Sequence, residues 1–472
     1  MSQRLPFSVS YWTGARESAE TLRAGTHFHF DLDAVNKFCL FDLPQRLVDL
    51  LRIASAIYVV DRLVKRRSQL GRRRRARSLG IKVDVLNIAF WNCQKVRETI
   101  SEAVDFVSGD DSWDIEFVKD TRVLSRAKQL LPDPNGAQSP LIALYSGGLD
   151  SAAGLACRIA ENTSRPVVAV TAWHQSRQRP LVRKQLDLLR RRFGAQIDSL
   201  MIKVQIDWNS GMDRKQQERS QRCRSFLFAS LGAVAAIMHG EQTIEMLESG
   251  VGAINLPLMA GSIGSRTTRS SHPEFLRLMS RLANLAGDRE IEFRLPFYEQ
   301  TKGQVVKHLV DLNLQKLASM TASCVGFPLR DSHAKQCGIC PACLFRRQAM
   351  KVAGIPEPDH AYKYDIFNPS SSDLIPVERL KYLKAFLMQV AQLDGVEMND
   401  RLSSAFERHV LSTRILQRGQ SQKGVIDLLA RYRDEWIAIA SHAQRNGHAW
   451  AKWLAPQRPQ ERQEQGVTYA SA

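Results

Sequence analysis

The run LIALYSGGLDS at positions 141–151 constrains the fold more than any other part of this chain. Five apolar residues at its start suit a buried parallel strand, and the small residues after Asp150 suit a helix. Between them, Gly147 and Gly148 permit positive φ and a close approach of the backbone to a ligand. A turn of this kind at a helix N-terminus presents N–H groups to an anion. The expected ligand is phosphate or pyrophosphate.

This turn differs from two common nucleotide-binding loops. The chain has no Gly-x4-Gly-Lys-Ser/Thr motif, and Gly-x-Gly-x-x-Gly is missing at this turn. SGGxDS after a strand instead resembles the PP-loop of the ATP-pyrophosphatase superfamily, whose members cleave ATP between the α and β phosphates. The resemblance implies catalytic roles for Ser146, Asp150 and Ser151, and Asp150 either holds Mg²⁺ or caps the helix. It implies ATP phosphate binding by Ser146, Gly147, Gly148, Leu149, Asp150 and Ser151.

The middle of the chain alternates strand-like and helix-like patterns. Strand-like runs are Leu141–Tyr145, Val167–Trp173, Leu200–Ile206 and Thr243–Leu247, separated by amphipathic or apolar helical stretches. Such alternation predicts an α/β fold, a parallel sheet of PP-loop type with helices on both faces. In such sheets the ligand lies at the carboxyl ends of the strands, where the SGGLDS turn follows its strand.

Composition and turn residues divide the chain into four segments. We expect an N-terminal α+β extension at 1–138, which ends in a loop rich in Pro, Asn and Gly. The PP-loop ATPase domain occupies 139–355, and a helical C-terminal domain occupies 356–455. The remaining residues, 456–472, are polar and rich in Gln and Arg, and are predicted to be disordered.

Positive charge is concentrated in one part of the chain. The net charge is +18, and Asp61–Gly80 holds nine basic residues against a single acidic one. A basic segment such as Lys65–Arg77 binds nucleic-acid phosphates or an acidic protein, or is a solvated loop without a ligand. No aromatic residue interrupts the segment, so base stacking gains no support there.

The sequence predicts a cytoplasmic protein. No apolar run reaches membrane-spanning length, and MSQRLPFSVS lacks the basic and apolar regions of a secretory signal. Four of the eight cysteines are clustered in a chain without an export signal, which favours a reducing compartment and a metal site.

The clustered cysteines have the spacing of a metal site. Cys324, Cys337, Cys340 and Cys343 form C-x12-C-x2-C-x2-C. Two-residue gaps let successive thiolates turn toward one ion, and four thiolates suit a closed, structural Zn²⁺ site. An iron–sulfur cluster is the alternative, because C-x2-C-x2-C also opens ferredoxin-type motifs.

Together these motifs resemble the QueC family of 7-cyano-7-deazaguanine synthases. After SGGLDS the chain has His272-Pro-Glu-Phe-Leu276, then Thr301-Lys302-Gly303, and finally Ser323-Cys324 with CGICPACLFR at 337–346, in the family's order. The resemblance favours zinc over an iron–sulfur cluster. It implies that ATP adenylates the carboxylate of 7-carboxy-7-deazaguanine and that an amine, ammonia in the standard enzyme, attacks the acyl-adenylate. A second ATP then drives dehydration to the nitrile.

The chain also departs from a typical member of that family. About 140 residues precede the PP-loop, about 120 follow the cysteine motif, and the family's Tyr-Pro-Asp-Cys run is replaced by ESGVGAINLP. This layout resembles the QueC-like proteins of bacterial anti-phage systems, such as QatC of the Qat system and its counterpart in type IV CBASS. That resemblance implies a partner-protein amine as acceptor. Plausible substrate-binding residues are Glu248, Asn255, Arg266 and Thr268, and phosphate or base contacts are expected of Arg222, Arg224 and Ser225.

Two other functions remain open at this point. A PP-loop enzyme that modifies tRNA would use the basic segment to dock RNA, and it would need a catalytic cysteine near the pocket or a sulfur donor. A non-catalytic nucleotide-binding scaffold in a defence complex would have little need for an intact SGGLDS motif.

Overall fold

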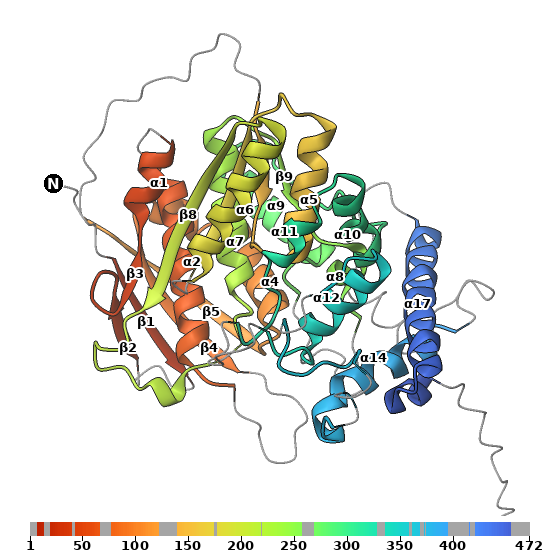
Figure 1. Ribbon diagram of the computed structural model, residues 1–472. Coiled ribbons are helices and arrows are strands. Elements are labelled where there is room, and N and C mark those ends of the chain that lie inside the picture. The colour runs from red at the N-terminus through yellow and green to blue at the C-terminus, as the bar shows by residue number, and fades with distance from the viewer. Residues whose placement is uncertain are drawn as a thin grey trace, which may run out of the picture.

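A computed structural model of the 472-residue chain shows two β-sheets with helices packed around them (Figure 1). The structure describes residues 7–13, 19–39, 43–66, 77–121, 139–173, 177–218, 220–256, 269–327, 336–357, 361–368, 372, 374–394, 415 and 421–454.

The central sheet has six strands in the order β10–β9–β6–β7–β8–β3. Five of them are parallel: β6 (Leu141–Leu144), β7 (Val167–Trp173), β8 (Ile197–Ile206), β9 (Thr243–Met246) and β10 (Glu292–Arg294). At one edge β3 (Phe28–Phe30) pairs antiparallel with the end of β8. The parallel sheet expected from the strand–helix alternation is therefore confirmed.

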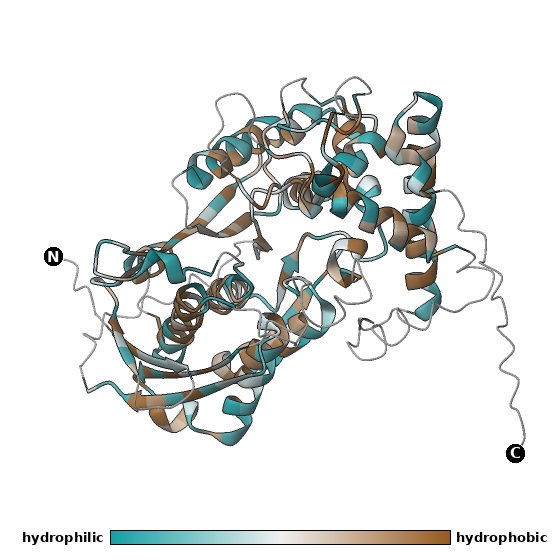
Figure 2. Ribbon diagram, turned by 90° about the horizontal axis from the view of Figure 1, so that it is seen from below, coloured by the Kyte–Doolittle hydropathy of each residue, from teal (hydrophilic) through white to brown (hydrophobic). Residues whose placement is uncertain are grey.

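Helices cover both faces of this sheet, and the alternation of residues along β6 shows why. Leu141 and Ala143 pack into one apolar cluster with α5 (Leu149–Glu161), whereas Ile142 and Leu144 pack into another with α7 (Arg224–Met238). Successive side chains of a strand point to opposite faces, so a strand covered on both sides is apolar throughout. In Figure 2 many helices carry hydrophobic and hydrophilic bands, as expected of helices with one buried face.

The first face carries four helices besides α5: α6 (Gln178–Phe193), α10 (Lys302–Asp311), α11 (Gln315–Ser319) and α12 (Pro341–Val352). The second face carries α7, α9 (Pro273–Gly287) and α2 (Gln45–Leu63), all in the larger cluster. The helices expected between the strands in the middle of the chain are present.

The chain reverses direction across the sheet between β6 and β9. From β6 it runs through β7 to β8 on one side, and then α7 carries it back to β9 on the other side of β6. In parallel sheets, such a reversal is the place where ligands bind, at the carboxyl ends of the two strands, which here are β6 and β9.

The N-terminal segment forms the second sheet, in the order β2–β1–β4–β5. Its strands are β1 (Ser8–Thr13), β2 (Glu20–Arg23), β4 (Ser78–Val85) and β5 (Ser112–Lys119), and its helices besides α2 are α1 (Leu32–Cys39), α3 (Ile88–Trp91) and α4 (Gln94–Ser108). Helix α2 contacts both β4 and α7, α4 contacts α9, and β3 belongs to the central sheet. The expected boundary at residue 138 is thus bridged by extensive packing, and the domain limits stay a prediction.

The C-terminal segment is helical within its described residues. It contains η4 (Val377–Leu380), α14 (Lys381–Ala391), α17 (Gln422–Arg445) and η5 (Ala449–Leu454). Helix α17 contacts α12, α14 and the short α8 (Gly250–Ile254) that follows β9 (Figure 1). Phe386 stacks on Trp436, and both are fully buried. The tail expected to be disordered lies outside the described residues.

Two arginines of the basic segment are buried in an ion-pair cluster. Arg66 and Arg77 each bind both Asp61 and Asp110, at nitrogen–oxygen distances of 2.6–3.0 Å. Burial alone would raise the pKa of Asp110, but the two guanidinium groups bring it below its ordinary value. These two cations are therefore internal rather than free to bind a nucleic acid. Residues 67–76, which include Arg67 and Arg72–Arg75, fall outside the described residues.

Among the described residues, no helix has both the length and the apolar character that crossing a membrane requires.

Candidate functional site

The SGGLDS turn joins β6 to α5 at the carboxyl end of β6. Gly147 has φ +77°, and a Cβ there would lie 2.8 Å from Cγ2 of Val182, so both backbone and packing require glycine. Gly148 caps α5, and its N–H lies 3.3 Å from Oγ of Ser146. Oγ of Ser146 also lies 3.2 Å from Oγ of Ser151. The turn expected from the sequence is therefore present.

The carbonyl groups of this turn are occupied from inside the protein. Thr171 donates its hydroxyl to the oxygen of Tyr145 (2.7 Å), and the Gln178 and Gln185 amides donate to the oxygens of Ser146 (3.3 Å) and Gly147 (3.2 Å). The first N–H groups of a helix have no partner within the helix. The turn thus keeps its carbonyl oxygens bound, while the first N–H groups of α5 have no acceptor within the helix, an arrangement suited to an anion.

A cluster of three ionisable side chains lies beside the turn. Asp150, in the first turn of α5, forms an ion pair with Lys302, the first residue of α10. Glu248 follows β9 and interacts with both of them. The three residues thus come from the carboxyl ends of the adjacent strands β6, β9 and β10, which is where a parallel sheet gathers residues distant in sequence.

The charged groups in this cluster shift one another's pKa values. Burial, followed by the charge of Asp150, raises the pKa of Glu248 to about 8, although Lys302 opposes the shift. Burial alone would lower the pKa of Lys302, but the two carboxylates raise it above its ordinary value. Within this cluster, the Glu248 carboxyl group therefore holds a proton that it can release near neutral pH. The Oδ1 atom of Asp150 is buried and has no hydrogen-bond partner among the described residues.

Glycines after Glu248 permit a close approach of the backbone. The N–H of Gly250 donates to the oxygens of Phe297 (3.1 Å) and Gln300 (3.0 Å), and a Cβ at Gly250 would lie 1.7 Å from the oxygen of Tyr298. A Cβ at Gly252 would lie 2.3 Å from Oε1 of Glu248. The sequence ESGVG thus brings Glu248 against the segment that leads to Lys302.

Of the other predicted substrate residues, Asn255 lies within the part of the chain that the structure describes. Asn255 ends α8 in the left-handed conformation, with φ +46°, and Arg266 and Thr268 lie outside the described residues. Arg222 donates to the oxygen of Ser108 (2.7 Å) and Arg224 to that of Ala172 (3.2 Å), so both contact backbone oxygens of the protein itself. Ser225 likewise donates to the oxygen of Arg222 at 3.3 Å.

Lys302 is a site residue that the sequence alone does not identify. Its only signal in the sequence is the Thr-Lys-Gly run at 301–303, which is a point of resemblance to the QueC family. Its pairing with Asp150 joins residues 152 positions apart, and no local pattern reports such a contact.

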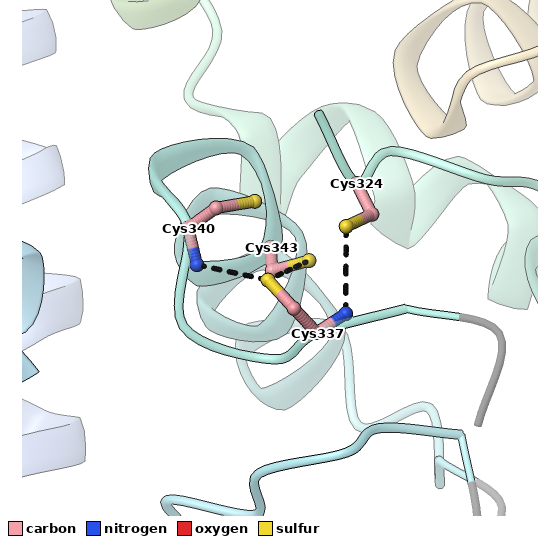
Figure 3. A group of neighbouring side chains, drawn as sticks. All are labelled: Cys324, Cys337, Cys340 and Cys343. Atoms are coloured by element: carbon pink, nitrogen blue, oxygen red, sulfur yellow. Dashed lines mark hydrogen bonds between the residues drawn. The ribbon is translucent and has the colours of Figure 1, made fainter. Parts of the chain in front are cut away.

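The four clustered cysteines meet at one point (Figure 3). Their sulfur atoms all lie within 4.8 Å of one another, and the Sγ atoms of Cys337 and Cys343 are 3.9 Å apart. Zinc–sulfur bonds of about 2.3 Å in a tetrahedron place sulfur atoms about 3.8 Å apart, so the set fits a single Zn²⁺ ion. An iron–sulfur cluster spreads its thiolates over separate irons, which this close grouping suits less well.

Local backbone geometry explains how the cysteines converge. Cys340 caps α12, Pro341 is its first residue, and Cys343 lies one turn further on. Gly338 has φ +84°, and a Cβ there would lie 2.1 Å from the oxygen of Tyr364. The N–H groups of Cys337 and Cys340 point at the Sγ atoms of Cys324 (3.4 Å) and Cys337 (3.3 Å), as suits thiolates.

Comparison with known proteins supports this geometry over part of the chain. Residues 269–354 match the family model described as "Queuosine biosynthesis protein QueC". A 7-cyano-7-deazaguanine synthase from Syntrophobacter fumaroxidans is 34% identical over 92 residues, 18% of this chain and 37% of the relative. One from Methylococcus capsulatus is 29% identical over 113 residues, 23% of this chain and 48% of the relative.

The matched segment holds Lys302 and all four cysteines, so the chain is QueC-like in this region. The chain spans less than half the length of these two relatives.

Proposed function

We propose that this chain is an ATP-dependent ligase of the QueC type. It adenylates the carboxylate of a 7-carboxy-7-deazaguanine and transfers the acyl group to an amine. The observation that carries the proposal is the ion pair between Asp150 and Lys302. It joins the phosphate-binding turn, which lies outside the matched segment, to a residue inside the segment that resembles QueC.

The reaction proceeds in two bond exchanges. A carboxylate oxygen of the substrate bonds to the α-phosphorus of ATP, and the bond from that phosphorus to the β-bridging oxygen breaks, releasing pyrophosphate. The amine nitrogen then bonds to the acyl carbon, the bond from that carbon to the AMP oxygen breaks, and the amine passes a proton to a base. Activation is needed because a free carboxylate is a poor electrophile. With ammonia, a second ATP dehydrates the amide to the nitrile.

The site residues suit this chemistry. The N–H groups of the SGGLDS turn stabilise negative charge that grows on the leaving pyrophosphate. Lys302 adds a positive charge at the same edge, and Ser146 and Ser151 supply hydroxyl donors. Glu248, with its pKa raised to about 8, is suited to take up the proton of the attacking amine near neutral pH.

The metal requirements follow from the donor sets. Asp150 would hold Mg²⁺ through its buried, unpartnered Oδ1, and the ion would neutralise triphosphate charge when bound. Cys324, Cys337, Cys340 and Cys343 would hold Zn²⁺ without an open coordination position, so its role is structural.

The proposal also names the amine that accepts the acyl group. The additional segments before the SGGLDS turn and after the cysteines are those in which the chain resembles the QueC-like proteins of anti-phage systems. We therefore propose a partner-protein amine as the acceptor, with ammonia as the alternative. The RNA-docking function draws less support, because Arg66 and Arg77 are engaged in internal ion pairs.

The proposal is tested by measuring pyrophosphate release from ATP. Release should require 7-carboxy-7-deazaguanine, and Asp150→Asn should abolish it. Asp187→Asn is the matched control, because Asp187 is an exposed carboxylate on α6 that pairs with Arg190. Equal release with bare tRNA and no acid substrate would refute the proposal in favour of tRNA modification. Intact-mass spectrometry of candidate partners after incubation would then separate a conjugate from a nitrile.

A further inference from the structure

Helix α17 of the C-terminal segment places a carboxylate beside the ligase site. Glu435 accepts a hydrogen bond from the hydroxyl of Thr301 through Oε1, and one from the amide of Gln348 through Oε2. Thr301 and Gln348 are both completely buried. One side chain of α17 thus joins the start of α10 to the middle of α12.

Thr301 controls how α10 begins. Its side chain accepts the N–H of Gln304 at 3.2 Å, while its own N–H donates to Oε1 of Gln304 at 2.9 Å, which completes a capping box. Because the Thr301 oxygen accepts that bond, its hydroxyl proton is free to be donated to Glu435. Lys302 is the next residue, so its position depends on this cap.

Close packing at the start of α10 restricts the position of α17. A Cβ at Gly303 would lie 2.9 Å from Oε1 of Glu435 and 2.4 Å from Cγ1 of Val352, so glycine lets α10, α12 and α17 meet. Further along, a Cβ at Gly250 would lie 2.6 Å from Cδ2 of Leu428 of α17. The helix therefore contacts both the start of α10 and the α8 segment that follows Glu248.

We propose that Glu435 is a positioning residue for the ligase site, which fixes the start of α10 through Thr301 and thereby holds Lys302 against Asp150. The inference rests on the proposed function and assigns the C-terminal segment a part in it. Negative charge beside the N-terminus of α10 also complements the helix dipole. Neither Glu435 nor α17 belongs to the segment that matches the QueC family.

Both oxygens of Glu435 are engaged by hydrogen-bond donors. The pKa of Glu435 is raised to about 7, because burial raises it more than the bonds from Thr301 and Gln348 and the charge of Arg431 lower it, and Asp434 raises it further. Both carboxylate oxygens accept hydrogen bonds, which suits the charged form. A glutamine at this position could keep the bond to Thr301, and once the Gln348 amide flips it could donate to Oε1 of Gln348, which has no partner among the described residues.

Steady-state kinetics of acid-dependent pyrophosphate release test the inference. Glu435→Ala should lower kcat by about 10- to 100-fold, the range seen when residues that orient functional groups are removed, with KM for ATP within about twofold. Glu435→Gln should recover most of the loss. Asp434→Asn is the control, because Asp434 is the neighbouring carboxylate, is mostly exposed, and pairs with Arg433. It should leave kcat within about twofold, because it removes no hydrogen bond to Thr301 or Gln348.

A second measurement requires no substrate. Mass spectrometry of the intact enzyme after acylation should show Lys302 labelled several-fold faster in Glu435→Ala than in the wild type or Asp434→Asn. Thr301→Val should give the same increase, which decides the matter if the alanine variant does not fold. Unchanged Lys302 labelling together with unchanged kcat would overturn the inference. If the wild type released no acid-dependent pyrophosphate, the proposed function would fail while the labelling result still stood.

Discussion

The cysteine cluster and the cluster of Asp150, Glu248 and Lys302 are built in opposite ways. Three of the four cysteines lie within seven consecutive residues, and the turn that gathers them is local. The three charged residues come from the ends of three strands, and they meet only once the sheet has formed. The first cluster can assemble before the fold is complete, whereas the second depends on it. A structural centre and a reactive centre thus make different demands on the same chain.

The contrast between the two clusters would be contradicted most clearly if the four cysteines were not needed for folding. Cys343→Ser should remove the metal and destabilise α12, because structural Zn²⁺ contributes on the order of 10 kcal/mol of binding free energy to folding. Metal analysis should give about one zinc per wild-type chain, and thermal unfolding should show the loss. Cys93→Ser is the control, since that exposed cysteine lies outside the cluster. Iron in place of zinc would contradict the assignment.

Removing the ammonium group should affect activity more than fold. Lys302→Met should lower kcat for pyrophosphate release by about a hundredfold or more, because a charge aimed at the leaving group acts mainly in the transition state. Circular dichroism should confirm that the variant remains folded. Lys316→Met, on the exposed side of α11, should leave kcat unchanged. A similar loss in both variants would mean that Lys302 has no special role.

The phosphate turn can be compared with a turn that has the same backbone strain but no neighbour. Gly194→Ala should destabilise the protein by about 1 kcal/mol, because φ is +64° there and nothing lies within 4 Å of the added Cβ. Gly147→Ala should cost about 1–3 kcal/mol more through its clash with Val182, and should also weaken ATP binding. Denaturant unfolding and nucleotide titration measure the two effects. Equal losses would show that the turn tolerates the extra atom.

The last expected effect is a pH dependence of stability. The pKa of Glu248 rises from 4.5 to about 8 on folding, so its stabilising contribution is complete below pH 4.5 and is lost as pH rises through 8. Between pH 5 and pH 8.5 the wild type should therefore lose about 1–3 kcal/mol relative to Glu248→Gln. Denaturation curves at the two pH values measure it. A constant difference would mean that Glu248 is ionised throughout.

Local patterns carried the prediction of the central sheet and of the cysteine motif. The apolar runs at 141–145 and 167–173 are buried on both faces, so their composition alone identifies them as parallel strands. The N-terminal sheet was not resolved into strands, because β1 pairs with β4 about 70 residues away and neither run is distinctive alone. Such pairing is set by tertiary packing, which one sequence does not report.

The candidate site was predicted in part for the same reason. SGGLDS reveals its turn, and Glu248 stands out because it follows a strand. Lys302 and Glu435 reach the site through contacts across the fold, and Glu435 lies on a helix whose apolar spacing indicates only a buried face. The internal ion pairs of the basic segment cannot be predicted from the sequence, because Arg66 and Arg77 have the pattern of surface charges. Only the fold places Asp61 and Asp110 beside them.

The ion pairs of Arg66 and Arg77 affect where the sequence of this protein can vary during evolution. Both bind the same pair of aspartates, so the two ends of the segment between them are fixed at a single anchored point. Closing a longer excursion between fixed ends adds little entropy loss, about 0.6 kcal/mol for each doubling of length. Insertions and substitutions between these two arginines can therefore accumulate without disturbing either sheet. Related chains should vary most in length there while keeping the four residues of the anchor.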